Sequence, residues 1–167
     1  MKKKPYIIAF FFFLVDFLSK IFISHKLVIG KSKEIIRNFF YITYTKNTGA
    51  AWSILSDQTV LLLIITVISL FIINKYMNKE KLNKYENYIY GMIIGGIVGN
   101  LYDRIFNHGV IDFFDFRIFG YHYPIFNLAD TFIVTGIIFL IIYNIRKERY
   151  ERNNSGRREN KNWFISS

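Results

Sequence analysis

Hydrophobic residues gather in four long stretches along the chain, separated by polar or mixed segments. The stretches are residues 6–23, 59–73, 88–102 and 128–143. A helix rises about 1.5 Å per residue, so about 20 residues are needed to cross a hydrocarbon core roughly 30 Å thick. The second and third stretches are short by this measure and need flanking residues to complete a span. The pattern predicts an all-α integral membrane protein with four transmembrane helices.

Basic residues form three clusters, which precede the first stretch, separate the second from the third and follow the fourth. The clusters are Lys2, Lys3 and Lys4; Lys75, Lys79, Lys81 and Lys84; and Arg146, Lys147, Arg149, Arg152, Arg157, Arg158 and Lys161. The positive-inside rule places all three in the cytoplasm, with both termini inside. The segments that then face outward are about 24–58 and 105–127. They also carry basic residues, but fewer than the three clusters, so the charge difference between the two sides is weakened and not reversed.

The N-terminal lysines and the apolar run behind them could also be interpreted as a secretory signal peptide. No small-residue cleavage site follows, however, and Asp16 and Lys20 continue the helix. Their i,i+4 spacing lets the two side chains pair on one face of the helix instead of facing lipid. We therefore interpret this segment as the first membrane span.

Both outer segments have the composition of short strands. Residues 34–46 are rich in β-branched and aromatic side chains with partial period-two alternation. Residues 110–126 are similar, with Gly120 as the expected turn between two aromatic-rich strands. Aromatic rings are favoured at the level of the lipid headgroups. The sequence thus predicts a small extracytoplasmic β-sheet cradle.

Charge and composition narrow the functional classes. The net charge of +10 suggests a nucleic-acid partner at first, but the basic residues are separated by apolar runs and form no continuous face. No cysteine is present, which excludes disulfides, thiolate metal ligands and a cysteine nucleophile. Residues 1–144 are expected to form the membrane domain, and 145–167 a basic cytoplasmic tail that is disordered because it has little to bury.

Polar residues persist inside the predicted spans, where an ionisable group costs at least about 2.5 kcal/mol. Asp16 and Lys20 lie in the first span. Five others end the third span or begin the fourth: Asn100, Asp103, Arg104, Asn127 and Asp130. These two ends meet on the outer side, so the five residues are expected to form one site. Glycines at spacing four in the third span are typical of close helix packing, which would hold that site firmly: Gly91, Gly95 and Gly99.

Two further carboxylates, Asp112 and Asp115, lie among apolar residues in the outer segment that follows the third span. A poorly solvated carboxyl has a raised pKa, and two adjacent carboxyls favour sharing one proton. If Asp112 approaches Asp130, one could deprotonate a water while the other polarises a carbonyl. The alternative is that the two carboxyls form a hydrogen-bonded pair with a structural role.

Taken together, the motifs resemble those of the lipoprotein signal peptidase family, also called signal peptidase II. Residues 47–53 read Asn-Thr-Gly-Ala-Ala-Trp-Ser, which is similar to its Asn-x-Gly-Ala-Ala-aromatic box. Residues 95–104 and 109–113 resemble its central signature, and Phe-Asn-Leu-Ala-Asp at 126–130 with Ile133 its last one. Asp16 and Lys20 fit its Asp-x-x-x-Lys pattern. One departure is that Arg37-Asn38, and no proline, precede the aromatic pair Phe39-Phe40.

The resemblance implies a membrane aspartyl endopeptidase that removes signal peptides from diacylglyceryl-modified prolipoproteins by cutting just before the lipid-modified cysteine. By position, Asp112 and Asp130 form the catalytic dyad. Substrate-binding or dyad-supporting positions are Asn47, Gly49, Asn100, Arg104, Asn127 and Ala129. Asp16, Lys20 and Asp103 would be structural. The implied setting is the bacterial cytoplasmic membrane, with the active site near the outer face, membrane lipids and prolipoproteins as partners, no nucleic acid, no cofactor, no metal and a monomeric unit.

Other assignments of the site and other functions make different predictions. Residue spacing alone does not choose between Asp112 and Asp115; the family register chooses Asp112. The outer histidines, which are His25, His108 and His122, form no recognised metal motif. A small transporter or channel subunit would spread ionisable groups through the membrane depth, whereas these gather at the outer end. A non-catalytic scaffold would tolerate Asp-to-Asn exchange at both dyad positions.

Overall fold

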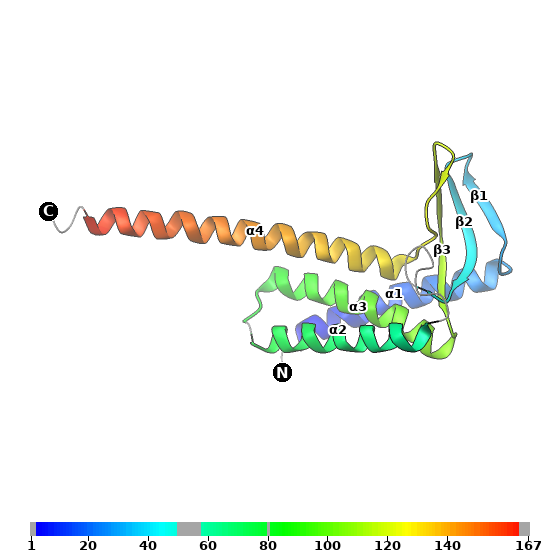
Figure 1. Ribbon diagram of the computed structural model, residues 1–167, viewed down its shortest axis with the longest axis horizontal. Helices are drawn as coiled ribbons and strands as arrows, with labels where there is room; N and C mark the ends of the chain where they lie inside the picture. The colour runs from blue at the N-terminus through cyan, green and yellow to red at the C-terminus, as the bar shows by residue number, and fades with distance from the viewer. Residues whose placement is uncertain (1–2, 50–57, 80, 164–167) are drawn as a thin grey trace.

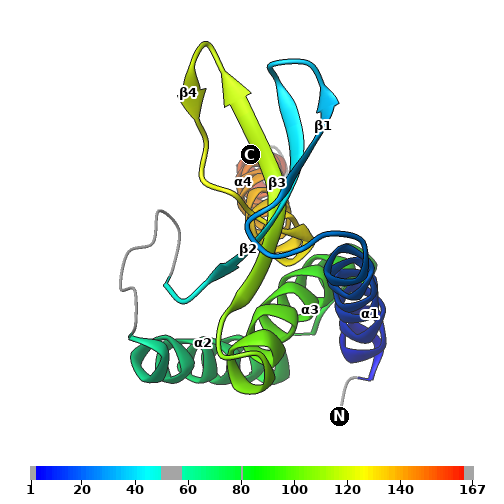
Figure 2. The same cartoon turned by 90° about the vertical axis from the view of Figure 1, so that its right-hand side faces the viewer.

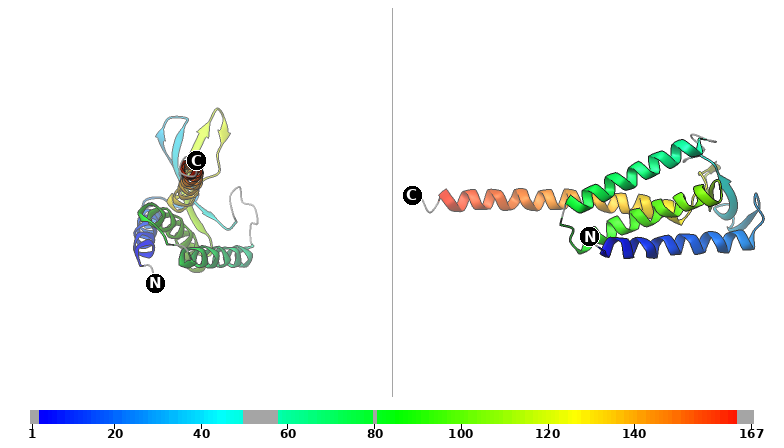
Figure 3. Two further views of the ribbon diagram at one scale, coloured as in Figure 1. Left: turned by 90° about the vertical axis from the view of Figure 1, so that its left-hand side faces the viewer. Right: turned by 90° about the horizontal axis from the view of Figure 1, so that it is seen from below.

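Four helices and a small antiparallel sheet make up the residues that the computed structural model describes, which are 3–49, 58–79 and 81–163. The helices are α1 (Lys4–Lys26), α2 (Thr59–Lys79), α3 (Lys84–Phe106) and α4 (Leu128–Trp163). The strands are β1 (Ser32–Ile36), β2 (Phe40–Asn47), β3 (Val110–Ile118) and β4 (Tyr121–His122). The sheet lies where α1 and α3 end and α4 begins, and both termini lie at the other end of the helices (Figures 1 and 3).

Three helices among the described residues are long and apolar enough to cross a membrane: Lys4–Lys26, Thr59–Lys79 and Leu128–Asn153. The remaining helix, α3, is central and packs against α1, α2 and α4. Its surface is turned largely to other helices, so its composition follows close packing and buried polar contacts more than lipid exposure. The prediction of spanning helices is therefore confirmed for three, and the fourth is taken up as a proposal below.

Local signals fix where helices start. Pro5 occupies the first turn of α1, where its missing N–H costs nothing. At α3, the Asn83 side chain accepts a hydrogen bond from Glu86 N (3.0 Å), and Glu86 Oε2 accepts one from Asn83 N (2.8 Å). This capping box satisfies two backbone donors that would otherwise lack partners. It extends α3 four residues before the apolar stretch at 88–102 that hydrophobicity alone outlines.

Glycines let α3 approach its neighbours closely. A Cβ placed on Gly91 or Gly95 would lie 2.6 Å from Ile8 Cγ2 or Ala9 O of α1, and one on Gly96 would lie 2.5 Å from Ala129 O of α4. These separations are shorter than any real Cβ contact. The packing role predicted for the glycine series is confirmed, with one face of α3 against α1 and the next against α4.

A buried ionic cluster joins three helices and the sheet. Lys20 Nζ lies 2.7 Å from Asp16 Oδ2 and 2.9 Å from Asp103 Oδ2, and none of the three residues is more than 2% exposed. Asp16 Oδ1 also accepts a hydrogen bond from Ala129 N of α4 (2.9 Å), and Asp103 Oδ2 accepts one from Ile111 N of β3 (3.1 Å). Each carboxylate thus pairs with Lys20 and holds the backbone of another element.

The sheet has the order β1-β2-β3-β4, with antiparallel neighbours throughout (Figure 2). Phe119 and Gly120 form the β3–β4 turn with φ of 50° and 79°, so Gly120 lies where the sequence predicts a turn. The ring of Phe116 stacks on Phe40 at 4.7 Å and on Phe126 at 5.8 Å between centroids. The predicted aromatic sheet is confirmed within both outer segments, although residues 24–26 and 105–106 belong to helices.

Helix α4 continues to Trp163 and extends beyond the other helices (Figure 1). The disorder expected for the basic tail from residue 145 stays a prediction. Elongating an existing helix needs no new nucleus, and the tail is rich in Arg, Lys and Glu, which are good helix formers. The division of the chain at residue 144 stays a prediction. Residues 50–53 of the glycine-alanine motif, with Trp52, lie outside the described residues.

We predict that Gly99→Ala destabilises the protein. The added Cβ would collide with Asp16 Oδ2, which cannot move aside because Asp16 is bound to Lys20 and to the backbone of α4. The expected loss is about 1–3 kcal/mol of unfolding free energy, even though alanine favours helix. Thermal unfolding in detergent should show a midpoint several degrees lower, while Val67→Ala on the exposed face of α2 leaves it nearly unchanged. A midpoint for Gly99→Ala at or above wild type would contradict the packing argument.

Candidate active site

Asp112 is the third residue of β3 and is 2% exposed. Strand pairing sets it opposite Thr45 of β2, close to the end of that strand at Asn47. Its carboxylate oxygens accept hydrogen bonds from two amides: Asn127 Nδ2 lies 2.6 Å from Oδ1, and Asn47 Nδ2 lies 3.1 Å from Oδ2. One side chain from the sheet and one from the start of α4 therefore hold Asp112 in place.

Asp130 is fixed by the cap of α4, in which it is the third residue. Asn127 Oδ1 accepts a hydrogen bond from Asp130 N at 2.9 Å, and Asp130 Oδ2 accepts one from Asn127 N at 3.3 Å. This reciprocal pair has the form of a capping box, and a carboxylate in the first helical turn is also favoured by the helix dipole. The residue that caps α4 is thus the same Asn127 that donates to Asp112.

Asn100 of α3 links the two carboxylates to the ionic cluster. Its Nδ2 donates to Asp130 Oδ1 at 2.7 Å. Its Oδ1 accepts from Asn127 Nδ2 and from Lys20 Nζ, each at 3.1 Å. Asp112 and Asp130 are consequently bound to one connected set of amides, with Lys20 behind it.

Burial raises the pKa of Asp112, and the negative charge of Asp130 raises it further, to about 7. The hydrogen bonds from Asn47 and Asn127 and the charge of Lys20 act in the opposite direction but do not outweigh burial. A carboxyl with this pKa is present in both protonation states near neutral pH. It can therefore act as a general acid or as a general base.

The carboxylates lie at the polar floor of a cleft of about 630 Å³. Its polar members are Asn47, Gly49, Asn100, Arg104, Asp112 and Asp130, together with Thr131 and Thr135. Apolar walls come from the connector before α4 and from α4 itself: Tyr123, Pro124, Ile125, Phe126, Ile133 and Val134, with Val110 of β3. A smaller hollow of about 380 Å³ lies beside Asn47 and Asp112 and includes Thr45, Thr48 and His122. Apolar and polar spaces thus meet at Asp112.

Arg104 brings a cation to the cleft and helps to shape its edge. Its Nη2 donates to Gly49 O and its Nη1 to Asn100 O, each at 3.4 Å. Gly49 N in turn donates to Asn47 Oδ1 at 2.9 Å, which orients the Asn47 amide toward Asp112. The Arg104 Nε group is buried and makes no hydrogen bond to the described residues.

Comparisons with known proteins agree with this geometry. The family model for signal peptidase (SPase) II matches residues 8–146 of the 167. The chain belongs to the signal peptidase II family. Two solved structures, each described as a bacterial membrane enzyme determined by the in meso method, are similar to it. The one at 2.3 Å resolution has a TM-score of 0.79 and 35% identity over 89% of this chain and 91% of its own. The one at 1.9 Å has a TM-score of 0.75 and 36% identity over 86% and 93%.

Signal peptidase II is a family of aspartic peptidases, so this bacterial membrane protein is a hydrolase of lipoprotein processing. The residues predicted from its sequence motifs come together in the structure. Six of them line the cleft, and Asn127 and Ala129 lie directly beneath it with no exposed surface. Asp16, Lys20 and Asp103 lie behind Asn100 and reach the cleft only through that residue.

Asp115 of this signal peptidase II is separate from the two carboxylates. It is 4% exposed and accepts hydrogen bonds from Thr43 Oγ1 at 2.8 Å and Arg117 Nη2 at 3.2 Å. Its interactions therefore belong to the sheet. None of the three histidines lines the cleft, although His122 borders the smaller hollow beside Asp112. Within the described residues, no group of three or more His, Cys, Asp or Glu side chains could hold a metal ion.

Sequence reasoning missed two features of the site. The apolar wall at Tyr123, Pro124 and Ile125 has a signal in the sequence, an apolar run just before the Asn-Leu-Ala-Asp motif, but the run is equally typical of a strand. The bond between Lys20 and Asn100 joins residues 80 positions apart. No local pattern indicates such a contact.

We predict that the carboxyl of Asp112 titrates near neutral pH. The pKa in the folded protein is about 7, above the ordinary 3.8, so the folded state retains a proton that the unfolded chain has lost. This group therefore lowers the unfolding free energy as pH rises from 3.8 to about 7. Infrared difference spectra should show a protonated-carboxyl band that disappears with a midpoint near pH 7.

Two variants assign that band. Asp112→Asn should abolish it, and Asp130→Asn should move its midpoint to lower pH, because the charge of Asp130 is one cause of the raised pKa. A midpoint that Asp130→Asn leaves unchanged would show that the two carboxyls do not interact.

Proposed function

We propose that the protein removes signal peptides from diacylglyceryl-modified prolipoproteins by cutting the peptide bond just before the lipid-modified cysteine, with Asp112 and Asp130 as the catalytic dyad. The observation that carries this proposal is that both carboxylates bind the same connected amides, Asn100 and Asn127, at the polar floor of an otherwise apolar cleft.

The chemistry needs one proton shared between the two carboxyls. The ionised member accepts a proton from a water molecule while the water oxygen bonds to the scissile carbonyl carbon. The protonated member donates its proton to the carbonyl oxygen, giving a neutral tetrahedral diol. When the diol breaks down, the C–N bond breaks, and the carboxyl that took the water proton donates it to the leaving nitrogen. The other carboxylate accepts a proton from one hydroxyl of the diol, which restores the starting state of the dyad. The pKa of Asp112, about 7, suits a group that alternates between the two states.

Supporting residues have separate roles in this proposal. Asn100 and Asn127 hold the dyad, and Asn47 orients Asp112 from the sheet. Gly49 and Arg104 form the edge of the cleft where the substrate backbone would lie, and the Arg104 side chain holds the Gly49 carbonyl in place. Ala129 must be small, because its Cβ lies beside Gly99 and its backbone oxygen beside Gly96.

The two spaces beside Asp112 suit the two parts of such a substrate. The larger cleft has apolar walls, which match a hydrophobic signal peptide and acyl chains that arrive from the bilayer. The smaller hollow includes Thr45, Thr48 and His122 and suits the polar polypeptide that follows the cysteine. A lipid-modified precursor carries both chemistries on either side of one peptide bond.

The proposed topology has α3 as the fourth span and both termini in the cytoplasm. The N-terminal lysines, the α2–α3 connector and the basic part of α4 lie together at one end, away from the sheet (Figure 3). The positive-inside rule puts that end in the cytoplasm, so the dyad lies near the outer face. The proposed unit is a monomer, with prolipoproteins and membrane lipids as partners.

Cleavage of a diacylglyceryl-modified prolipoprotein by purified protein in detergent tests the dyad. We expect Asp112→Asn and Asp130→Asn each to reduce turnover by at least about 100-fold, because each removes a group that transfers a proton. Asp115→Asn is the matched control, since it replaces another buried carboxylate of the same strand that is bound to Thr43 and Arg117. It should retain near-normal turnover.

Each variant must first unfold at a temperature close to that of wild type. Near-normal activity in either dyad variant would refute the assignment, and selective loss in Asp115→Asn would move the role to that residue. A folded wild-type protein that never cuts the substrate would refute the proposed function and reopen the transporter interpretation.

Topology can be tested with single cysteines, because the natural chain has none. We expect a membrane-impermeant maleimide to label Lys31→Cys, next to β1, in intact cells. Lys81→Cys, in the α2–α3 connector, should be labelled only after the cells are permeabilised. Both positions are exposed lysines in wild type, so the pair is matched in chemistry. The opposite labelling pattern would show that the protein has the inverted orientation in the membrane.

A further inference from the structure

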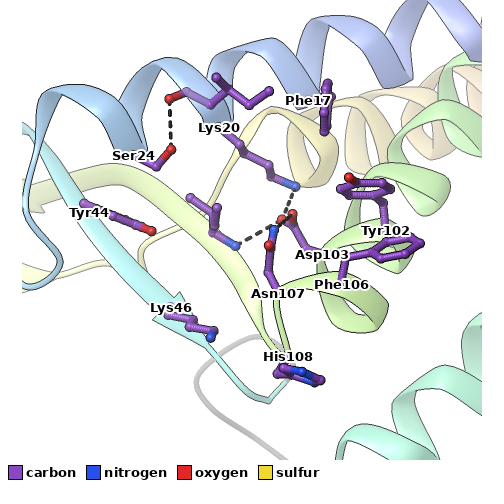
Figure 4. Close-up of a pocket in the computed structure, with 12 residues that line it drawn as sticks. Phe17, Lys20, Ser24, Tyr44, Lys46, Tyr102, Asp103, Phe106, Asn107 and His108 are labelled. Atoms are coloured by element: carbon purple, nitrogen blue, oxygen red, sulfur yellow. Dashed lines mark hydrogen bonds and ion pairs between the residues drawn. The ribbon is translucent and has the colours of Figure 1, made fainter.

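A second cavity, of about 550 Å³, lies on the side of the β2–β3 pair opposite to Asp112. Lys46 pairs with Ile111 in the sheet, and both line this cavity, whereas the neighbouring pair Thr45 and Asp112 borders the smaller hollow beside the cleft. Lys46 is exposed at the edge between the two spaces and borders that hollow as well. The rest of the cavity is formed by the last turns of α1 and α3 and by His108 (Figure 4). It does not belong to the site described above.

One side of the cavity is aromatic. The rings of Phe17 and Tyr102 meet edge to face at 5.1 Å, and those of Tyr102 and Phe106 lie 4.6 Å apart between centroids. These residues come from the segments of α1 and α3 that run back toward the interior of the helix bundle. They offer an apolar surface of the kind that packs against acyl chains or methylene groups.

The other side is polar and carries the accessible cation. Ser24, Tyr44, Asn107 and His108 supply hydroxyl, amide and imidazole groups, and Lys46 is exposed at the same edge. In Figure 4, Lys46 and His108 lie away from the rings of Tyr102 and Phe106. The cavity is therefore divided between an apolar side and a basic, hydrogen-bonding side.

The charged residues on its floor are already paired with one another. Asp103 Oδ2 accepts from Lys20 and Ile111, and Asp103 Oδ1 accepts from Asn107 Nδ2 at 2.9 Å. Because these carboxylate oxygens are occupied, Lys46 at the edge is the charge that an incoming group would meet. That charge favours an anion.

We propose that this cavity binds an anionic phospholipid, with the phosphodiester at Lys46 and the donors of Asn107 and His108, and with the first part of the acyl chains against Phe17, Tyr102 and Phe106. A juxtamembrane lysine attracts anionic headgroups, and the sheet lies at the end of the helices where headgroups begin. From the helices to the sheet, the cavity lining changes from apolar to basic. This matches the acyl chains and the phosphate headgroup of a phospholipid. The cavity shares no lining residue with the cleft that holds Asp112 and Asp130.

Native mass spectrometry of the full-length protein tests this proposal with phosphatidylglycerol and, separately, phosphatidylcholine of the same chains. We expect wild type to retain one phosphatidylglycerol in preference to phosphatidylcholine, and Lys46→Ala to weaken that binding about fivefold, the effect typical of one surface lysine. Lys33→Ala is the matched control, because Lys33 is an exposed lysine on β1 outside the cavity. It should bind as wild type does.

Three outcomes would overturn the proposal: equal retention of the two lipids, unchanged binding in Lys46→Ala, or an equal loss in Lys33→Ala, which would mean diffuse surface charge. Glycerol phosphate, which has no acyl chains, should not displace the lipid at equal concentration, and displacement would assign the cavity to a small phosphate compound. None of these measurements uses peptide cleavage, so they stand whether or not the proposed function does.

Discussion

The fold depends on one buried lysine. Lys20 neutralises Asp16 and Asp103 inside the helix bundle, where an unpaired charge would cost several kcal/mol. The two carboxylates then use their remaining capacity to bind Ala129 N, at the start of α4, and Ile111 N, at the start of β3. Asp130 is one residue beyond the first contact, and Asp112 is one residue beyond the second. The ion cluster thus sets the positions of both proposed catalytic carboxylates without contacting either.

Asn127 and Asn100 connect the ion cluster and the start of α4 to the two proposed catalytic carboxylates. Amides can donate and accept at once, so Asn127 caps α4 through its oxygen while its nitrogen holds Asp112, and Asn100 accepts from Lys20 while donating to Asp130. The donors on Asp112 favour its ionisation, whereas burial and the charge of Asp130 oppose it, and burial is the larger effect. Carboxylates without these amides would be free to turn away. With them, both side chains are held in place, and Asp112 has a pKa of about 7, where it can gain or lose a proton.

Whether the sequence predicts a feature depends on how far apart along the chain the interacting residues are. Helix positions, the turn at Gly120 and the pairing of Asp16 with Lys20 are local, so period, turn chemistry and i,i+4 spacing predict them. The Asn127–Asp130 cap is local too, although its second function as a donor to Asp112 is not. The bond of Lys20 to Asn100, the choice of Asp112 over Asp115 and the apolar wall at Tyr123 to Ile125 depend on tertiary packing. Of these three, the family register indicates only the choice of Asp112.

The low hydropathy of α3 has the same origin as the site. A helix surrounded by α1, α2 and α4 exposes little surface to lipid, so its sequence is free to carry glycines for close approach and Asn100, Asp103 and Arg104 for polar contacts. By length and hydropathy, α1, α2 and residues 128–153 of α4 are candidate spans, and the inner helix α3 is not among them. The same inward packing leaves the last turn of α3 bordering two spaces, with Asn100 and Arg104 toward the cleft and Tyr102, Asp103 and Phe106 toward the second cavity. Lys20 bonds to Asp103, which lines the second cavity, and to Asn100, which lines the cleft, so one ion cluster forms the boundary between the two spaces.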